Sequence, residues 1–93
     1  MNRLSPEEAR SRVARLPGWQ IEAGLIAKTF QFKDFVASLH FVNRLGEAAE
    51  AAGHHPDIDI RYNRVRLSLT THDAGGLTEK DFDLAARADK LAK

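Results

Sequence analysis

The hydrophobic pattern of this chain switches repeatedly between the period of a helix and the period of a strand. Apolar residues recur at helical spacing near both ends and in the middle, and they alternate with polar residues in the two stretches between. Each alternating stretch contains a turn signal, Ala23-Gly24 in the first and Asn63-Arg64 in the second, and so predicts a β-hairpin. Because short hairpins pair antiparallel, the pattern predicts an α+β fold of order α-β-β-α-β-β-α. We expect one four-stranded antiparallel sheet with three helices packed on one of its faces.

Capping residues mark the ends of the three predicted helices. Ser5, followed three residues later by a glutamate, has the spacing of a capping box, and its helix is expected to run to about Arg15. Asp34 precedes a longer second helix, which Gly53 is expected to end. Thr78 precedes the last helix.

The same periodicities predict which side chains form the core. On the strands, the expected apolar faces consist of Ile26, Phe30 and Phe32; Ile58, Ile60 and Tyr62; and Val65, Leu67 and Leu69. On the long helix, we expect one continuous buried stripe of Phe35, Leu39, Val42, Leu45, Ala49 and Ala52.

Size and composition limit the class of protein. Ninety-three residues suffice for one domain, 1–93, and 43% apolar with 29% charged residues is typical of a globular chain. The chain has no cysteine, so a disulfide framework and a thiolate nucleophile are excluded. It contains neither a membrane-spanning apolar run nor an apolar secretory segment at its start, and we expect it in the cytoplasm.

The charge balance argues against nucleic acid as a partner. Fourteen basic and thirteen acidic residues leave a formal net charge of +1, whereas a dedicated nucleic-acid binder is usually strongly basic. Arg61, Arg64 and Arg66 cluster around one tyrosine, and we interpret them as the solvated end of the second hairpin.

Three of the four histidines fall within residues 54–72. His54 and His55 are adjacent, so in extended backbone their side chains point apart, which does not favour a shared metal ion. Taken singly, each residue has a structural interpretation. His40 is an ordinary residue of the long helix, His54 suits the end of that helix, and Asp81 suits the start of the last one.

Pairing of the second hairpin brings these residues together. Counted from the Asn63-Arg64 turn, residues 54–56 lie level with residues 71–73, so His54 and His72 are expected to be neighbours in space. Imidazoles beside a carboxylate suit general acid–base work near neutral pH. Without a nucleophile, a phosphate-binding loop or a metal motif, the pattern favours a proton-transfer reaction such as elimination or addition of water.

The chain resembles the pterin-4a-carbinolamine dehydratases. Glu50, the run His54-His55-Pro56, Tyr62, His72 and Asp81 all match the pattern of that family. The segments "GW" (18–19), "FKDF" (32–35) and "THDAGGLTEKDFDLA" (71–85) are similar as well, and the likeness extends from about Leu4 to Leu91.

The resemblance implies a hydro-lyase that dehydrates 4a-hydroxytetrahydrobiopterin to the quinonoid dihydropterin and water. Such an enzyme recycles the pterin cofactor of aromatic amino acid hydroxylases. The pterin is the substrate, and the resemblance implies neither a cofactor nor a metal. It also implies a homodimer or a homotetramer.

Carried over position by position, the resemblance implies a catalytic set of three histidines, His54, His55 and His72. His54 and His72 are the acid–base candidates, with acid and base unassigned, and His55 orients the substrate. Asp81 fixes an imidazole tautomer or holds the pterin ring N–H groups. Glu50 and Trp19 shape or line the pocket.

Two other functions are open at this point. The same fold could serve as a non-catalytic binding, dimerisation or assembly factor, since function lives in sites rather than in folds. Nucleic-acid contact through Arg61, Arg64 and Arg66 would reveal itself as steeply salt-dependent binding.

Overall fold

The order of the elements agrees with the prediction over residues 2–93, the part of the chain that the computed structural model describes. The elements are α1 (Pro6–Val13), β1 (Gln20–Glu22), β2 (Leu25–Gln31), α2 (Phe35–Ala52), β3 (Asp57–Arg61), β4 (Arg64–Leu69), the 3₁₀ helix η1 (His72–Ala74) and α3 (Glu79–Leu91). The α-β-β-α-β-β-α order and the α+β fold class are confirmed. η1 was not anticipated.

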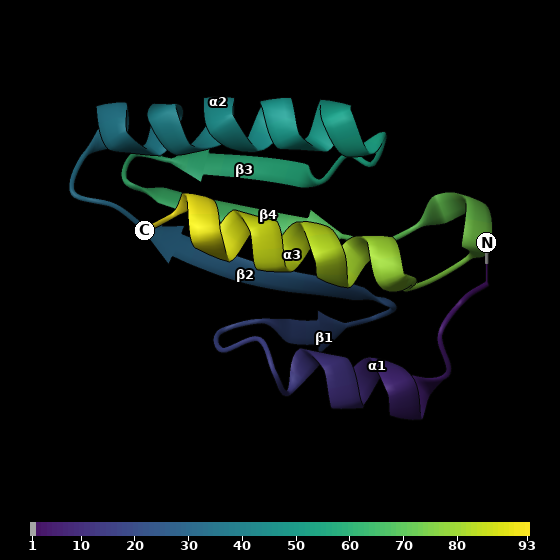
Figure 1. The fold of residues 1–93 in the computed structure, drawn as a ribbon. Coiled ribbons are helices and arrows are strands. Elements are labelled where there is room, and N and C mark those ends of the chain that lie inside the picture. Colours follow the sequence, from purple (N-terminus) through teal and green to yellow (C-terminus); the bar gives the residue numbers. More distant parts are fainter. Residues whose placement is uncertain (1) are drawn as a thin grey trace.

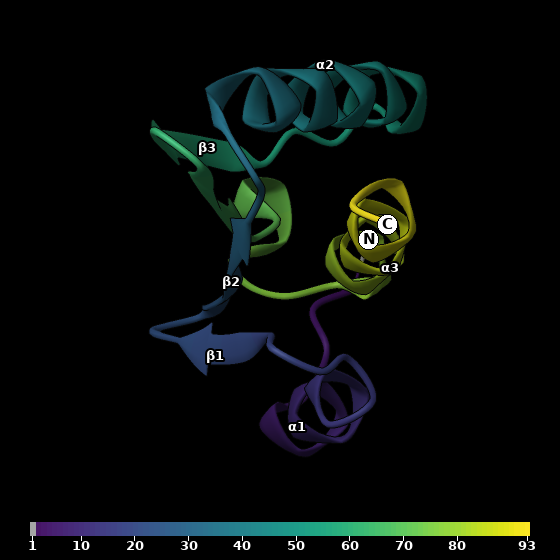
Figure 2. The ribbon, with the colours of Figure 1, turned by 90° about the vertical axis from the view of Figure 1, so that its left-hand side faces the viewer.

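The four strands form one antiparallel sheet of order β1-β2-β4-β3. β2 and β4 are central, so the two hairpins join through their second strands. Viewed from the side, the three helices lie on one face of this sheet, with α3 between α2 and α1 (Figures 1 and 2). Over residues 2–93, the other face carries no helix, as expected.

The predicted caps are present. The Ser5 hydroxyl accepts the N–H of Glu8, and the Glu8 carboxylate accepts the N–H of Ser5, which completes the capping box of α1. The Asp34 carboxylate accepts the N–H of Ala37 at the start of α2. α1 ends at Val13 rather than near Arg15. A proline after Leu16 disfavours helical backbone there, so the chain tightens into a turn.

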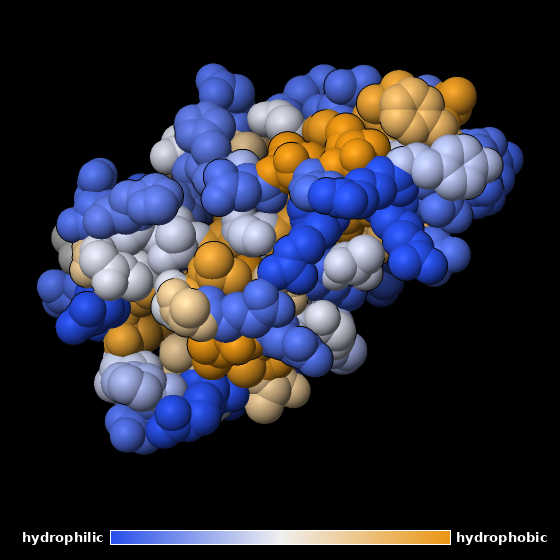
Figure 3. Space-filling model, turned by 180° about the vertical axis from the view of Figure 1, so that it is seen from behind, coloured by the Kyte–Doolittle hydropathy of each residue, from blue (hydrophilic) through white to orange (hydrophobic). Residues whose placement is uncertain are grey.

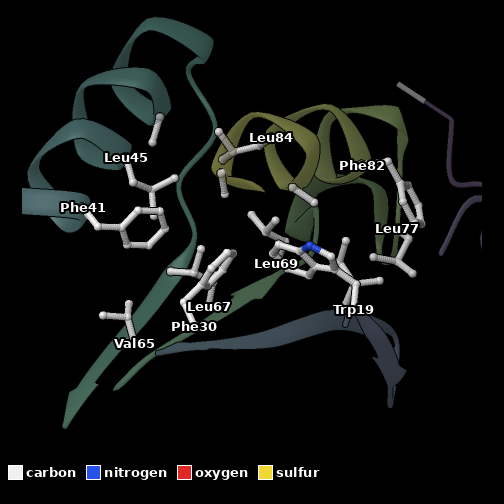
Figure 4. Close-up of a cluster of buried hydrophobic side chains, with 14 of the residues drawn as sticks. Trp19, Phe30, Phe41, Leu45, Val65, Leu67, Leu69, Leu77, Phe82 and Leu84 are labelled. Atoms are coloured by element: carbon white, nitrogen blue, oxygen red, sulfur yellow. The ribbon is translucent and has the colours of Figure 1, made fainter. Parts of the chain in front are cut away.

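The core lies between the sheet and the helices (Figure 4). Its largest fully buried apolar side chains are Phe41, Ile26, Leu45, Leu67, Leu69 and Val65. Phe41 packs between the rings of Phe30 and Phe32, with centroid distances of 4.9 and 5.0 Å. The structure therefore buries the predicted apolar faces of β2 and β4. The predicted apolar face of β3, with Ile58, Ile60 and Tyr62, is instead exposed, because β3 is an edge strand of the sheet.

The buried stripe of α2 differs from the prediction. Ser38, Phe41, Leu45 and Ala49 are buried, whereas Phe35, Leu39 and Ala52 are exposed. The helix is apolar on more than one side, so periodicity alone offers two stripes. Contact with the sheet selects the stripe that contains Phe41 and leaves the other one outside.

The turn of the second hairpin also differs. The chain turns at Tyr62 and Asn63, since Arg61 pairs with Arg64 and Asp57 pairs with Ser68. A tertiary contact fixes this register: Phe32 N–H donates to the carbonyl of Asn63, and the Asn63 side chain donates to the carbonyl of Phe32. Tyr62 consequently adopts φ of 53°, the left-handed conformation that such tight turns require.

Candidate active site

Three elements meet at one end of the molecule. The end of α2, the segment after β4 with η1, and the start of α3 all lie at the end that is on the right in Figure 1. The three histidines of the 54–72 segment belong to this end. Extended past its last pair, the β3–β4 register places residue 54 level with residue 71 rather than 73.

The end of α2 sets the direction of the two adjacent histidines. Gly53 adopts the left-handed conformation (φ 63°) and the N–H of His54 donates to the carbonyl of Ala49, which closes the helix. The side chains of His54 and His55 then leave the backbone in different directions. That of His54 is 11% exposed and that of His55 is 62% exposed.

His54 is held by a buried carboxylate. Its Nε2 lies 2.5 Å from Oδ1 of Asp81, which is in the first turn of α3 and has no exposed surface. The other oxygen, Oδ2, accepts the hydroxyl of Thr71 and the N–H of Thr78, each at 2.9 Å. Both oxygens of Asp81 are therefore engaged inside the protein.

The three histidines open onto one cavity of about 420 Å³. His72 reaches it from η1, because the chain leaves β4 after Leu69 and turns at an isolated bridge between Thr71 and Gly76. The cavity is lined by Gly53, His54, His55, Thr70, Thr71, His72, Asp73 and Lys80. Its mouth is open, and polar and apolar groups both contribute to its lining, which suits a ligand that forms hydrogen bonds.

Glu50 lies beside this cavity rather than in its lining. Its carboxylate is 2.5 Å from Nε2 of His55, and both side chains are mostly exposed. The pair lies at the outer side of the site. Glu50 can thus orient His55, in addition to the pocket-shaping role that the sequence implies.

Trp19 lies apart from the histidines in this chain. Its ring is 4% exposed and packs edge-on against Phe30 in the core (Figure 4). The indole N–H donates to the carboxylate of Asp89, at 3.1 and 3.2 Å from its two oxygens. The structure therefore brings together the histidines, Asp81 and Glu50, but not Trp19.

His40 is an exposed residue on α2 and takes no part in the cavity. Over residues 2–93, no group of three or more His, Asp or Glu side chains is arranged to hold a metal ion. In the same range, none of the helices is both long enough and apolar enough to cross a membrane.

Two threonines that hold Asp81 are site residues that the sequence did not indicate. The sequence predicts Thr78 only as a helix cap, and the site role of Asp81 comes from the resemblance alone. A threonine followed by an acidic residue three positions later nevertheless has the capping-box spacing. That spacing directs the carboxylate toward the helix start. The contact with Thr71 has no local signal, because it joins residues ten positions apart. Lys80, at the cavity rim, was also overlooked.

The arrangement is suited to moving protons. Because an ionised carboxylate only accepts hydrogen bonds, Nε2 of His54 carries hydrogen in the pair with Asp81, and Nδ1 remains for exchange. His55 and His72 supply further imidazoles around the same space. No covalent intermediate is needed for such chemistry.

Comparison with known proteins gives a consistent family. The family model described as pterin 4 alpha carbinolamine dehydratase matches residues 2–91. A protein of Acidobacterium capsulatum that carries the name of a pterin-4-alpha-carbinolamine dehydratase is 58% identical over 91 residues, covering 98% of this chain and 99% of its own. A Nostoc protein with the same name is 53% identical, covering 95% of each chain.

Two solved structures extend the likeness to the fold. A transcriptional coactivator/pterin dehydratase from Brucella melitensis superposes with a TM-score of 0.95 at 35% identity, over 99% of this chain and 100% of the other. A pterin dehydratase-like protein, described as a RuBisCO assembly factor in the alpha-carboxysome, superposes with a TM-score of 0.66 at 28% identity. That match covers 80% of this chain and 86% of the other.

Proposed function

This chain belongs to the pterin 4 alpha carbinolamine dehydratase family, and we propose that it dehydrates 4a-hydroxytetrahydrobiopterin to the quinonoid dihydropterin and water. The observation that carries the proposal is the His54–Asp81 pair, which opens onto the cavity that His55 and His72 also line. The family membership names the substrate class, and this pair supplies the chemistry.

The reaction needs one proton removed and one delivered. A pterin ring nitrogen loses its proton, the hydroxyl at C4a gains one and leaves as water, and a carbon–nitrogen double bond forms. We assign the base to Nδ1 of His54, because the buried carboxylate on Nε2 stabilises the imidazolium that results. His72, the other acid–base candidate that the resemblance implies, is then the acid, and it lines the same cavity.

The remaining side chains bind and orient. His55, held by Glu50, contributes a hydrogen-bonding imidazole at the outer side of the cavity. Asp81 acts through His54, because its own oxygens are fully engaged. The substrate-binding role implied for Trp19 stays a prediction of the sequence.

Replacing single histidines tests the proposal. His54→Ala and His72→Ala should each lower the rate of dehydration, followed by ultraviolet absorbance, by roughly 10²-fold to 10⁴-fold with the circular dichroism spectrum unchanged. His40→Ala, on the exposed side of α2, is the matched control and should keep the native rate. Full activity in either site variant would remove that residue from the mechanism, and a native chain no faster than buffer would overturn the function.

A second part of the proposal is self-association. Phe35, Val36 and Leu39 of α2 are 45%, 56% and 36% exposed, and Ile58 and Ile60 of the edge strand β3 are 39% and 37% exposed. Figure 3 shows apolar residues at the surface in several places on this face, and β3 lies beside α2 in Figures 1 and 2. An apolar patch beside an unpaired strand edge is the usual mark of an interface. We assign it to a second copy of this chain, in a homodimer or a homotetramer.

The physiological setting belongs to the same proposal. Recycling of the pterin cofactor of an aromatic amino acid hydroxylase, in the cytoplasm, follows from the family resemblance. Its support is the pterin named for the family and for the relatives.

An assembly role is the second candidate function. It rests on the likeness to the RuBisCO assembly factor, which is weaker in both coverage and superposition than the likeness to the Brucella protein. The dehydration assay separates the two, because an assembly factor need not accelerate the reaction.

A further inference from the structure

The buried carboxylate of Asp81 has more partners than a helix cap needs. Thr78 N–H and the Thr71 hydroxyl both donate to Oδ2, and the Thr71 and Thr78 hydroxyl oxygens are 2.8 Å apart. The exposed fractions of Thr71, Thr78 and Asp81 are 7%, 0% and 0%. Among residues 2–93, no buried side-chain nitrogen or oxygen is left without a hydrogen-bond partner.

The chemistry of these groups fixes the direction of every hydrogen bond. A carboxylate only accepts, so the single proton of the Thr71 hydroxyl points at Asp81. The Thr71 oxygen must then accept from the Thr78 hydroxyl. The chain of donors runs from Thr78 to Thr71 to Asp81, and it meets the Nε2–H of His54 from the other side.

Thr71 also holds the loop that carries His72. Its backbone N–H donates to the carbonyl of Gly76, and its carbonyl accepts from Ala74 and Gly76, which closes η1. One residue thus connects two candidate groups. Its backbone shapes the loop of His72, and its hydroxyl holds the carboxylate behind His54.

We propose that Thr71 is a positioning residue, whose hydroxyl fixes Asp81 so that His54 keeps the Nε2–H tautomer and presents Nδ1 to the substrate. This inference rests on the proposed function for its effect on rate, but its effect on the imidazole exists without substrate. Removal of the Thr71 hydroxyl leaves Oδ2 of Asp81 with the Thr78 N–H as its one donor. The carboxylate can then rotate, and both neutral tautomers of His54 become accessible.

Other charged groups around the pair do not substitute for this hydroxyl. On the cavity side these are His55, His72, Asp73 and Lys80, and on the side between α2 and α3 they are Lys80, Asp83 and Arg87. The side chains of Lys80, Asp83 and Arg87 on α3 are exposed to water, where solvent screens their charges. Asp81 is the partner of His54 that is fully buried.

The test compares Thr71→Val, which keeps the shape but removes the hydroxyl, with Thr71→Ser, which restores it. Nitrogen-15 NMR of the histidine rings, without substrate, should show one tautomer of His54 in the native chain and in Thr71→Ser. It should show a mixture in Thr71→Val. Thr29→Val, on the exposed side of β2, is the matched control and should leave His54 unchanged. If Thr71→Val does not fold, Thr71→Cys gives the same comparison with a weak donor.

Kinetics supply the second readout. Thr71→Val should lower kcat by roughly 10-fold to 100-fold with KM nearly unchanged. Thr71→Ser should keep most of the native kcat. An unchanged His54 tautomer in Thr71→Val would overturn the inference whatever the activity. A shifted tautomer in a chain that never dehydrates the pterin would instead overturn the proposed function alone.

Discussion

Single polar side chains join distant parts of this small domain. Asp89 on α3 accepts the indole N–H of Trp19 and the ammonium group of Lys28, the latter at 2.8 Å. Lys28 also donates to the carbonyl of Pro17 and lies 4.7 Å from the ring centre of Phe30. One carboxylate therefore ties α3 to β2 and to the segment before β1. Asp81 does the same for α3 and the end of α2.

Asp89→Asn should lower the free energy of unfolding by about 1–3 kcal/mol, because it leaves the mostly buried ammonium of Lys28 without its charged partner. Chemical denaturation followed by the fluorescence of Trp19 measures this change. The control is Asp59→Asn, because the pair that Asp59 forms with Arg61 is largely exposed. This substitution should change the free energy of unfolding by less than about 0.5 kcal/mol. Equal effects of the two variants would contradict the prediction.

Helix ends carry much of what positions the site. α2 stops at Gly53 and immediately presents His54, while α3 starts at Thr78 and presents Asp81 one turn later. The two helices approach each other, so their ends bring the imidazole and the carboxylate into contact. Two backbone features that are local in the sequence therefore create a contact between residues 27 positions apart.

Gly46 inside α2 and Gly53 at its C-cap should respond oppositely to the same substitution. Gly53→Ala forces a side chain into the left-handed conformation (φ 63°) and should cost about 1 kcal/mol of stability. Gly46→Ala lies inside the helix, and its added Cβ meets no atom within 4 Å. Gly46→Ala should therefore raise the free energy of unfolding by about 0.5–1 kcal/mol. Thermal unfolding at one protein concentration measures both, and a gain in Gly53→Ala would contradict the assignment of the cap.

The capping box of α1 should make stability depend on pH. The backbone and side-chain hydrogen bonds of Ser5 lower the pKa of Glu8 from its ordinary value of 4.5. The stabilisation is therefore fully present above the unfolded pKa and is lost as the pH falls through the lower folded value. Glu8→Gln keeps an acceptor but cannot titrate. Urea unfolding between pH 7 and pH 3 should show a smaller loss of stability in Glu8→Gln than in the native chain, and identical curves would count against the box.

The described part of the chain leaves several large apolar side chains partly exposed on its outside. β3 lies beside α2 (Figures 1 and 2), and both the outward stripe of α2 and the apolar face of β3 are partly exposed. A chain of 93 residues buries a limited part of its surface by itself. Association of copies through this surface would add the burial that a single copy lacks.

Leu39→Glu should shift the protein to a smaller assembly, because it places a charge in the middle of the exposed α2 stripe. Size-exclusion chromatography with light scattering gives the mass directly. Gln31→Glu adds the same charge at an exposed position of β2 and serves as the control. A native chain that is already monomeric would overturn the proposed self-association.

The sequence by itself determined the order of elements, the caps at Ser5, Asp34 and Thr78, and the stop at Gly53. It also indicated that the histidines before β3 and after β4 lie close together, and they line one cavity. These features depend on residues that are near one another along the chain. Periodicity, capping and hairpin pairing are local, so the pattern of side chains records them.

Only the tertiary structure decided three other features. It selected the α2 stripe that contains Phe41, it placed the second turn at Tyr62, and it joined Thr71 and Asp81 behind His54. Each depends on contacts between segments that are distant in sequence. A helix with two apolar stripes, or a turn with two adjacent candidate positions, has no local preference strong enough to choose. The sheet, the Phe32 backbone and the start of α3 make the choice, because burying an unpaired polar group or leaving the core unfilled costs more than any local preference.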